Sequence, residues 1–515
     1  MSSKTITYIL VILILLVLSL AILANSMTKP IGRDEQMYCT GGILLAQGKM
    51  IYRDFSYIAQ MPYHPLLCAA LFKIFGTTHY LLVGRILSAL CDILVVICIV
   101  GIYRYVFHSF PVSGLLLGLA ASVLYVFNPA VDYANGFAWN NDIVILCVLL
   151  AFWLFISIDF DRKSKYWRIA AIGALLTFAA CMRITTALIQ VLFFAVVLVQ
   201  SADSIKQRLK TALPFLIASA AVLIWPIWTI VLAPRAFYLN LVWIPMLNSE
   251  WLHQTGMVHN RLALILSSAT TPGYLVLILI AAYLCLAIAR YRRRLNITNK
   301  TDPAFAIMLT LAFFIIASAM PMTWKQHFAM PVPFLVICFA YPLMYLTELI
   351  SQAAPDKRFN TAAIVVAACT FVAVASHPLV LYRIPQLLDR KNWVPLHLHR
   401  ISQDIAERAE SPKLILTLSP LFALEGGSNI YPQLSAGPFV YRIADFMNPQ
   451  DIEITKTVSP KMLEELLENS PPSAVVIGFE PTFLEESLYQ AAVKSDREKW
   501  QRKIYDNGPV VYFRR

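Results

Sequence analysis

Two adjacent carboxylates, Asp34 and Glu35, follow the first long apolar run of the chain. That run, residues 6–24, contains no charged residue and is long enough to cross the hydrocarbon core of a bilayer as a helix. The acid pair therefore lies almost at the membrane surface, where it can do acid–base chemistry on a substrate that resides in the bilayer. The simpler alternative is a solvated acid pair beside the membrane.

The loop after the first span, residues 25–79, has an unusual composition. Aromatic and hydrogen-bonding side chains crowd it, which suits a binding site better than a connector. They are Tyr38, Tyr52, Arg53, Asp54, Phe55, Tyr57, Gln60, Tyr63 and His64. The loop also predicts two short helices, near 36–47 and 64–75, that are too short to cross a membrane and are expected to lie along its interface.

A second polar loop ends at Asp142, at the mouth of the following apolar run. Asp142 either caps the helix that begins there or contributes a second carboxylate to the site. Both Asp34 and Asp142 are expected at the same membrane surface, so the two side chains can converge.

Three charges interrupt apolar stretches. Arg85 and Asp92 are seven residues apart and therefore roughly on one helix face. A charge inside a span costs about 2.5–3.5 kcal/mol on insertion scales, so such residues usually face a partner or a cavity. A structural pair and a functional pair both remain open. Arg183 divides the apolar stretch 169–199; it either aims a cation at the site from the tip of a helical hairpin or marks topology.

Lys325 and His327 follow the ninth predicted span, just before Pro331 and Pro333 break the start of the next helix. They are either interfacial anchors or phosphate contacts. A cation about 4 Å from a phosphate oxygen gains on the order of 4 kcal/mol in a partly buried setting. It stabilises a departing phosphate most as negative charge builds there.

Composition fixes the broad class. Of 515 residues, 58% are hydrophobic and only 14% are charged, which is too little charge to cover a soluble protein of this size. The net charge of +12 is explained by basic cytoplasmic loops rather than by nucleic-acid binding, because no basic stripe lies elsewhere. The long first run predicts a retained anchor, not a cleaved signal peptide.

The apolar runs predict about eleven spans in a mainly α polytopic bundle. After residues 6–24 they cover 81–106, 113–128, 142–158, 168–182, 184–200, 212–232, 273–290, 303–320, 328–349 and 361–381. Basic residues collect on the side of Lys4, which the positive-inside rule makes cytoplasmic. They are Arg162, Lys163, Lys165, Arg168, Lys206, Arg208, Lys210, Arg290, Arg292, Arg293, Arg294, Lys357 and Arg358. The loops 25–79, 129–141, 233–272 and 321–327 then face outward, with the C-terminal tail.

A change in character near residue 385 divides the chain into a membrane domain, 1–384, and a small extracytoplasmic α/β domain, 385–515. Apolar runs shorten there to strand length and alternate with helical patterns. The predicted strands are 414–419, 474–478 and 510–513, and the predicted helices are 401–410 and 461–468. Pro and Gly crowd 420–440, which predicts a loop.

The nine cysteines are scattered, with no C-x-x-C and no zinc spacing. Cys39 and Cys68 are the pair that shares one outer loop. They either form a disulfide or behave, as isolated cysteines usually do, as small hydrophobic residues.

With these residues in place, the chain resembles the GT-C superfamily of integral-membrane glycosyltransferases. It is most similar to the bacterial proteins grouped with protein O-mannosyltransferases and to the lipid A aminoarabinose transferases. The resemblance rests on the order along the chain of the acid pair Asp34-Glu35, the stretch 41–67, the Asp142 loop, residues 324–333 and a small outward C-terminal domain.

The resemblance implies an inverting transfer of a sugar from a polyprenyl phosphate to an acceptor hydroxyl at the outer face of the membrane. Asp34 would be the general base, and Lys325, His327 and Arg183 would hold the leaving phosphate. Further contacts in the sugar and acceptor pocket would come from Glu35, Tyr63, His64 and Asp142. The acceptor would be a glycolipid, a polysaccharide or a protein, in a bacterial inner or plasma membrane.

No D-x-D motif occurs in the predicted outer loops, so we expect no obligatory metal and no cofactor. A transporter or lipid flippase is the alternative function. It would predict inverted repeats and ionisable residues at mid-membrane, whereas the polar groups here gather at one face. A non-catalytic scaffold is a third possibility, which substitution of Asp34 would separate from an enzyme.

Overall fold

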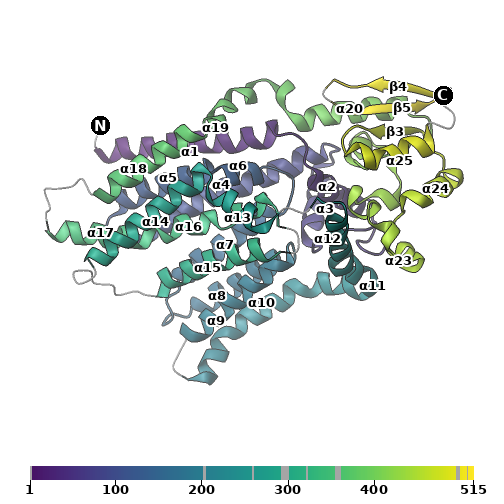
Figure 1. The fold of residues 1–515 in the computed structure, drawn as a ribbon. Helices are drawn as coiled ribbons and strands as arrows, with labels where there is room; N and C mark the ends of the chain where they lie inside the picture. The colour runs from purple at the N-terminus through teal and green to yellow at the C-terminus, as the bar shows by residue number, and fades with distance from the viewer. Residues whose placement is uncertain are drawn as a thin grey trace.

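The computed structural model describes residues 3–200, 204–257, 260–291, 301–320, 323–353, 361–493, 499–506 and 508–515. A long helical bundle carries the N-terminus at one end and a smaller C-terminal segment with a β-sheet at the other (Figure 1). Two groups of predicted basic loop residues, 292–294 and 357–358, lie outside the described residues.

The bundle consists of apolar helices, and each predicted span falls on one of them. Six helices are long and apolar enough to cross a membrane, and one bent pair makes a seventh. Three further predicted spans, 113–128, 142–158 and 184–200, fall on shorter apolar helical stretches, Pro111–Val126, Asn141–Ile156 and Ile184–Gln200. The chain is thus a multi-pass membrane protein. Its bundle helices are α1 (Ser3–Thr28), α4 (Tyr80–Val106), α5 (Pro111–Val126), α7 (Asn141–Ile156), α8 (Lys165–Ala180), α9 (Ala187–Gln200), α10 (Ile205–Leu232), α14 (Pro272–Tyr291), α15 (Thr301–Ala319), α16 (Val332–Cys338), α17 (Ala340–Ala353) and α18 (Thr361–Ser376).

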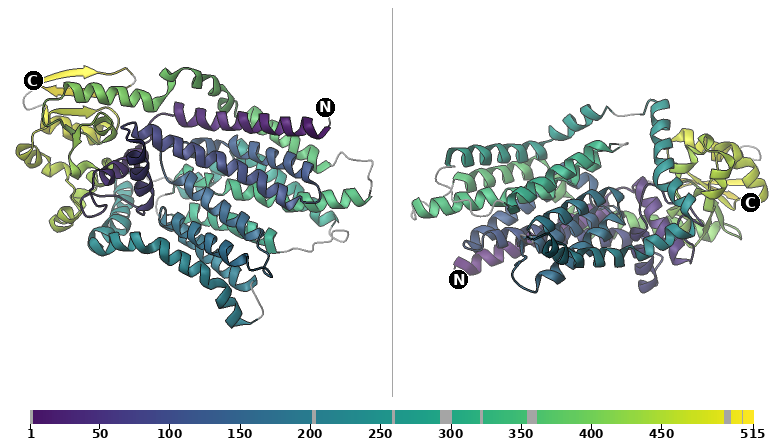
Figure 2. Two further views of the ribbon diagram at one scale, coloured as in Figure 1. Left: turned by 180° about the vertical axis from the view of Figure 1, so that it is seen from behind. Right: turned by 90° about the horizontal axis from the view of Figure 1, so that it is seen from below.

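Two short helices follow α1, as predicted: α2 (Arg33–Ala46) and α3 (Tyr63–Phe75). They lie at the end of the bundle that meets the C-terminal segment (Figures 1 and 2). They pack closely, because a Cβ on Gly42 of α2 would lie 2.7 Å from the Cβ of Cys68 on α3. Cys39 and Cys68 are buried free thiols, not a disulfide.

The predicted outer loop 233–272 is largely helical. It forms α11 (Pro234–Tyr238), a π-helical turn (Leu239–Trp243), α12 (Ile244–Gln254) and α13 (Arg261–Ala269). Asn240 in the π turn holds the first outer loop, since its side-chain oxygen accepts from the Tyr57 amide at 3.0 Å and its carbonyl accepts from the Ala59 amide at 3.0 Å. Another short helix, α6 (Pro129–Ala134), opens the Asp142 loop.

The C-terminal segment contains a five-stranded sheet of order β2-β1-β3-β5-β4. Strand β1 pairs in parallel with β2 and β3, whereas β5 is antiparallel to both β3 and β4. The strands are β1 (Leu414–Leu416), β2 (Asn429–Ile430), β3 (Ala474–Ile477), β4 (Trp500–Ile504) and β5 (Val510–Arg514). The three predicted strands are confirmed as β1, β3 and β5, and the small α/β character of this segment is confirmed with them.

Short helices surround the sheet. They are α20 (Val394–Arg408), α21 (Leu421–Leu424), α22 (Pro438–Tyr441), α23 (Pro449–Ile454), α24 (Leu463–Asn469) and α25 (Thr482–Ala492). Helix α19 (Leu379–Tyr382) instead lies beside α1 and continues the bent pair that begins with α18 (Figure 1). The predicted helices 401–410 and 461–468 fall on α20 and α24. The prediction that 420–440 is loop is wrong, because it holds α21, β2 and the start of α22. Helix α22 begins at Pro438 and Pro420 comes directly before α21, so these prolines mark helix starts as well as loops.

The ends of the bundle differ in charge. The starts of α1, α8 and α10 and the end of α14, where predicted basic loops attach, lie away from the C-terminal segment (Figure 2). Helices α2, α3 and α12 lie at the opposite end. The predicted site residues on α2 and α3 therefore lie where the bundle meets the C-terminal segment (Figure 1).

Candidate functional site

Asp34 lies in the first turn of α2, where the amide groups of a helix N-terminus favour a carboxylate. Its side chain is half-buried, and the Gln326 amide nitrogen is 3.4 Å from its Oδ2 atom. Burial raises the pKa of Asp34, and the charges of Arg33, Arg183 and Arg442 oppose that rise. The result is a partly accessible carboxylate in a cationic setting.

Arg183 follows α8 in an extended conformation and precedes the 3₁₀ turn Ile184–Thr186. Its Nη1 atom lies 3.4 Å from the Asn141 side-chain oxygen and 3.2 Å from the Met330 sulfur. Burial lowers the pKa of Arg183, while Tyr38 and Asp34 raise it. The hairpin between α8 and α9 thus carries a cation whose charge lowers the pKa of Asp34, and its role as a phosphate contact stays a prediction.

A second cation, Arg442, comes from the C-terminal segment and was not predicted. Its Nε donates to the Asn248 side-chain oxygen at 2.7 Å, and its guanidinium lies 4.8 Å from the centre of the Trp251 ring. Burial lowers the pKa of Arg442 to about 10, with the carboxylates of Glu480 and Asp34 opposing. Arg442 stays cationic near neutral pH. Arg183 and Arg442 therefore act on Asp34 from distant parts of the chain.

The other predicted phosphate contacts occupy a 3₁₀ turn, Lys325–Ala329. Lys325 is exposed, whereas His327 is buried and its Nδ1 accepts from the Trp324 amide at 3.3 Å. The same turn places Gln326 against Asp34. The segment 324–329 therefore does reach the Asp34 region, with Lys325 at its surface.

Glu35 points away from this cluster into the protein. Its Oε1 is 2.6 Å from Arg85 Nη2, and neither side chain is exposed. The carboxylate also accepts from the amides of Gly32 at 2.6 Å and Ala138 at 2.9 Å. Arg85 is thus half of a structural ion pair with Glu35, not with Asp92, and the pair fixes the turn that carries Asp34.

Comparison with known proteins adds to this geometry. Residues 59–229 match the family described as dolichyl-phosphate-mannose-protein mannosyltransferase. The structure of ArnT from Cupriavidus metallidurans bound to undecaprenyl phosphate is similar over 99% of this chain and 98% of its own, with a TM-score of 0.62 and 15% identity. This chain has the GT-C fold. The resemblance predicted from the sequence is confirmed.

A second similar GT-C structure is the oligosaccharyltransferase of Archaeoglobus fulgidus tethered with an acceptor peptide. It matches 98% of this chain and 74% of that one, with a TM-score of 0.52 and 11% identity. A comparison with curated protein sequences gives no match.

Two residues predicted for the sugar pocket make mainly structural contacts. The hydroxyl of Tyr63 donates to the Val222 carbonyl on α10, and its ring packs against Phe178. His64 is buried edge-on against Tyr38, with ring centres 4.9 Å apart. His64 therefore supports Tyr38. Tyr38 in turn interacts electrostatically with Asp34.

Asp142 belongs to a second buried polar cluster. Its Oδ2 accepts from the Gly136 amide at 3.3 Å, and Asp92 is its strongest electrostatic neighbour. Asp92 in turn accepts from the Tyr125 hydroxyl at 2.5 Å. The structure thus brings Asp142 to Asp92 rather than to Asp34. The link to the Asp34 cluster is the adjacent residue, Asn141, through Arg183.

A D-x-D triplet does occur in this GT-C chain, at Asp159–Asp161, in the loop between α7 and α8. Asp159 pairs there with Arg162 at 2.9 Å. This loop lies at the end of the bundle away from Asp34 (Figure 1). The triplet therefore offers no ligands to the Asp34 cluster.

Proposed function

We propose that this chain is a glycosyltransferase that moves a sugar from a polyprenyl phosphate to an acceptor hydroxyl, with Asp34 as the general base. One observation carries the proposal: Asp34 is a half-buried carboxylate of raised pKa that interacts with two arginines from distant parts of the chain. A base needs access to its substrate and a pKa above that of a free carboxylate. A leaving phosphate needs fixed cations nearby.

The reaction follows from these roles. Asp34 takes the proton of the acceptor hydroxyl while that oxygen attacks the anomeric carbon, and the bond from that carbon to the phosphate oxygen breaks. Its electron pair stays on the phosphate, where Arg183, Arg442 and Lys325 balance the charge. Attack from the face opposite the phosphate inverts the anomeric configuration. Glu35 acts as a positioning residue, through its ion pair with Arg85.

The donor class rests on the GT-C relative whose structure holds undecaprenyl phosphate. An acceptor that is a glycolipid, a polysaccharide or a protein fits the same chemistry. The positive-inside rule assigns Asp34 and residues 385–515 to the outer face of the membrane. The proposal places the protein in the inner or plasma membrane of a bacterial cell. In this proposal residues 1–384 form the catalytic membrane domain, and the remaining residues form a small outer domain that supplies Arg442.

The test is sugar transfer in purified membranes from a panel of labelled polyprenyl-phosphate sugars. Asp34→Asn keeps the size of the side chain but cannot accept the proton, so we expect a loss of at least about a hundredfold. Asp54→Asn is the matched control, because Asp54 lies in the same outer loop but pairs with the exposed Arg53 at 2.8 Å. Its activity should stay close to that of the wild type.

Each other outcome is informative. Equal transfer by wild type and Asp34→Asn would remove Asp34 as the base and direct attention to Asp142. A folded wild-type protein that transfers no sugar from any donor would contradict the proposal and favour the transporter or flippase alternative.

A further inference from the structure

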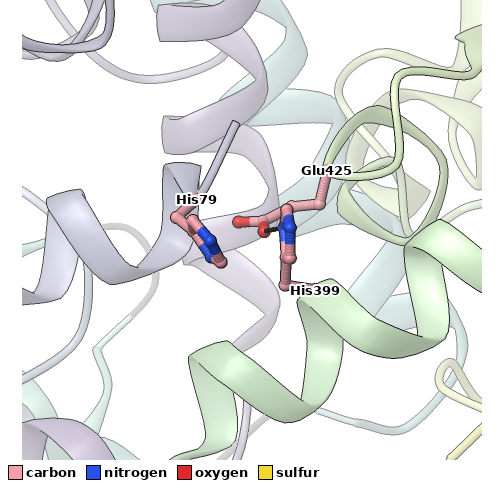
Figure 3. Close-up of side chains that lie close together, drawn as sticks. All are labelled: His79, His399 and Glu425. Atoms are coloured by element: carbon pink, nitrogen blue, oxygen red, sulfur yellow. Dashed lines mark hydrogen bonds and ion pairs between the residues drawn. The ribbon is translucent and has the colours of Figure 1, made fainter. Parts of the chain in front are cut away.

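A cluster of metal-ligating side chains lies apart from the Asp34 cluster. His79, His399 and Glu425 each offer one ligand atom, and these atoms lie within 4.8 Å of one another (Figure 3). They come from three elements: His79 precedes α4, His399 lies on α20, and Glu425 follows α21. The membrane bundle and the C-terminal segment therefore both contribute.

The carboxylate of Glu425 is held in place from two directions. Its Oε1 accepts from the Leu81 amide at 2.6 Å, and its Oε2 lies 2.8 Å from Nδ1 of His399. If both groups bind one metal ion, this contact would be replaced by a bond from each of them to the ion. The backbone of α4 thus fixes one oxygen and leaves the other facing the histidines.

His79 supplies the second observation. Its ring lies 3.7 Å, centre to centre, from that of His399, and its Nδ1 is buried with no hydrogen-bond partner among the described residues. A buried polar atom without a partner is destabilising and rare in folded proteins. A metal ion with both imidazoles as ligands would replace this close contact between the rings.

We infer that His79, His399 and Glu425 bind a zinc ion. Imidazole nitrogens and a carboxylate oxygen are common zinc ligands, at about 2.0–2.2 Å from the metal. Tetrahedral bonds of that length separate the ligand atoms by about 3.3 Å, so small side-chain rotations close the observed spacing. Three protein ligands leave a fourth position open.

The surroundings indicate what fills that position. A surface cavity of about 380 Å³ borders both histidines. The cations that line it are Arg390, Lys391 and Arg400. They would oppose a bare dication, so the fourth ligand is an anionic oxygen drawn from the cavity, such as hydroxide or phosphate.

The zinc would join the C-terminal segment to the start of α4. A second tie lies at the other end of α21, where the Leu421 amide donates to the side-chain oxygen of Gln36 on α2 at 3.0 Å. Together the two ties would hold α21 against the start of α4 and against α2, the helix that carries Asp34. The inferred zinc takes no part in the proposed transfer step, in which Asp34 and the cations near it act.

Zinc binding by the purified full-length protein tests the inference. The protein is stripped with a chelator, reloaded with zinc, dialysed and analysed for bound metal and for melting temperature. We expect a single zinc ion per chain and a higher melting temperature with zinc. His79→Ala, His399→Ala and Glu425→Gln should each weaken zinc binding by more than about 10–100-fold, which is the loss typical for changing only a partner of a ligand.

His397→Ala is the matched control. His397 lies two residues from His399 on α20 and contacts the Asp506 carbonyl at 3.3 Å instead; its loss should leave zinc binding unchanged. His79 is only half-buried, so its variant should keep the wild-type helical circular dichroism. Cobalt substitution gives a second readout, because the visible absorption of four-coordinate cobalt should appear in wild type and disappear in His79→Ala.

Two results would overturn the zinc site. One is a folded wild-type protein that retains no zinc or cobalt after reloading. The other is His79→Ala and His399→Ala proteins that bind zinc as tightly as the wild type. Sugar transfer is not part of this test, so the zinc site and the proposed function can fail separately.

Discussion

At the scale of single residues, Arg183 is one of the arginines, after Arg33, whose charge opposes the rise in the pKa of Asp34. Burial raises the pKa of Asp34 and Arg183 lowers it, so Arg183→Gln should raise that pKa further. A base works only when deprotonated. The acid limb of kcat/KM for sugar transfer should therefore move to higher pH in the variant, in addition to any fall in rate from weaker phosphate binding.

Arg53→Gln is the control for this pH profile, because Arg53 is exposed and pairs with Asp54. Its acid limb should coincide with that of the wild type. An acid limb that stays in place in Arg183→Gln would mean that Asp34 is not the group whose titration limits the rate.

The Glu35–Arg85 ion pair gives a prediction about stability. Arg85→Met would leave the buried Glu35 carboxylate without its cation, which costs about 3–5 kcal/mol. The three backbone carbonyls that Arg85 also contacts, those of Ser26, Lys29 and Pro30, would lose a donor too. We expect a large fall in melting temperature, measured by fluorescence-detected size exclusion after heating.

The double variant Arg85→Met with Glu35→Gln removes the uncompensated charge. It should recover part of the lost melting temperature. If the double variant is no more stable than the single one, the lost carbonyl contacts and not the unpaired carboxylate explain the damage.

The sequence was informative where a charge interrupts an apolar run. Arg183 stands out for that reason, and Asp34 because it comes soon after the first apolar run; the charge of Arg183 lowers the pKa of Asp34. Arg442 could not be found this way, because it lies just past the Pro- and Gly-rich stretch 420–440, in a C-terminal region with many other charges. Its neighbour Asn248 is 194 positions away in sequence. Arg85 was recognised as paired, but its partner Glu35 lies on another element, which helical spacing cannot reveal.

At the scale of elements, helices α8 and α10 approach so closely that only glycine fits at one contact. A Cβ on Gly173 of α8 would lie 2.5 Å from the backbone oxygen of Phe215 on α10. Backbone atoms cannot rotate away as a side chain can. Gly173→Ala should therefore force the helices apart and lower both the melting temperature and the yield of folded protein.

Gly101→Ala is the informative comparison for this contact. A Cβ there would lie 2.3 Å from the tip of the Trp153 ring, which is a shorter distance but a movable side chain. We expect a smaller loss of melting temperature than for Gly173→Ala. The reverse order would show that the Trp153 ring is more firmly held than the α8–α10 backbone contact.

Elements were predictable in proportion to how long and how apolar they are. The spans and strands β1, β3 and β5 follow from continuous apolar runs. Strand β2 was missed because it is two residues long. Strand β4, Trp500–Ile504, was missed because its run WQRKI is mostly polar, as suits an edge strand. The order of the sheet depends on pairing between segments far apart in sequence, such as Ile415 opposite Ala474, which local patterns do not contain.

At the scale of the whole molecule, the C-terminal segment docks on the bundle through polar contacts as well as packing. Ser56 donates to the Thr455 carbonyl at 2.6 Å. Arg235 pairs with Asp451 at 2.8 Å. A third contact, between Arg33 and Glu480 at 2.7 Å, lies one residue from Asp34. Because Arg442 belongs to the docked segment, the strength of docking also sets the charge around Asp34.

Glu480 makes this docking depend on pH. Its side chain is not exposed at all, and burial raises its pKa to about 7 against the opposing charge of Arg33. A carboxyl group whose folded pKa exceeds its unfolded value of about 4.3 stabilises the fold fully below that value, and this stability is lost as the pH rises through 7. The loss amounts to up to about 3 kcal/mol.

Glu480→Gln removes the buried charge and keeps the shape of the side chain. Its melting temperature should exceed that of the wild type at pH 8, and the gap should close as the pH falls to 5, where the wild-type carboxyl is already neutral in the folded protein. Glu464→Gln, at an exposed position on α24, should show no such pH-dependent gap. A Glu480→Gln protein less stable than wild type at pH 8 would mean that attraction to Arg33 outweighs the cost of burying the carboxylate, and that the Arg33–Glu480 pair strengthens docking most above neutral pH.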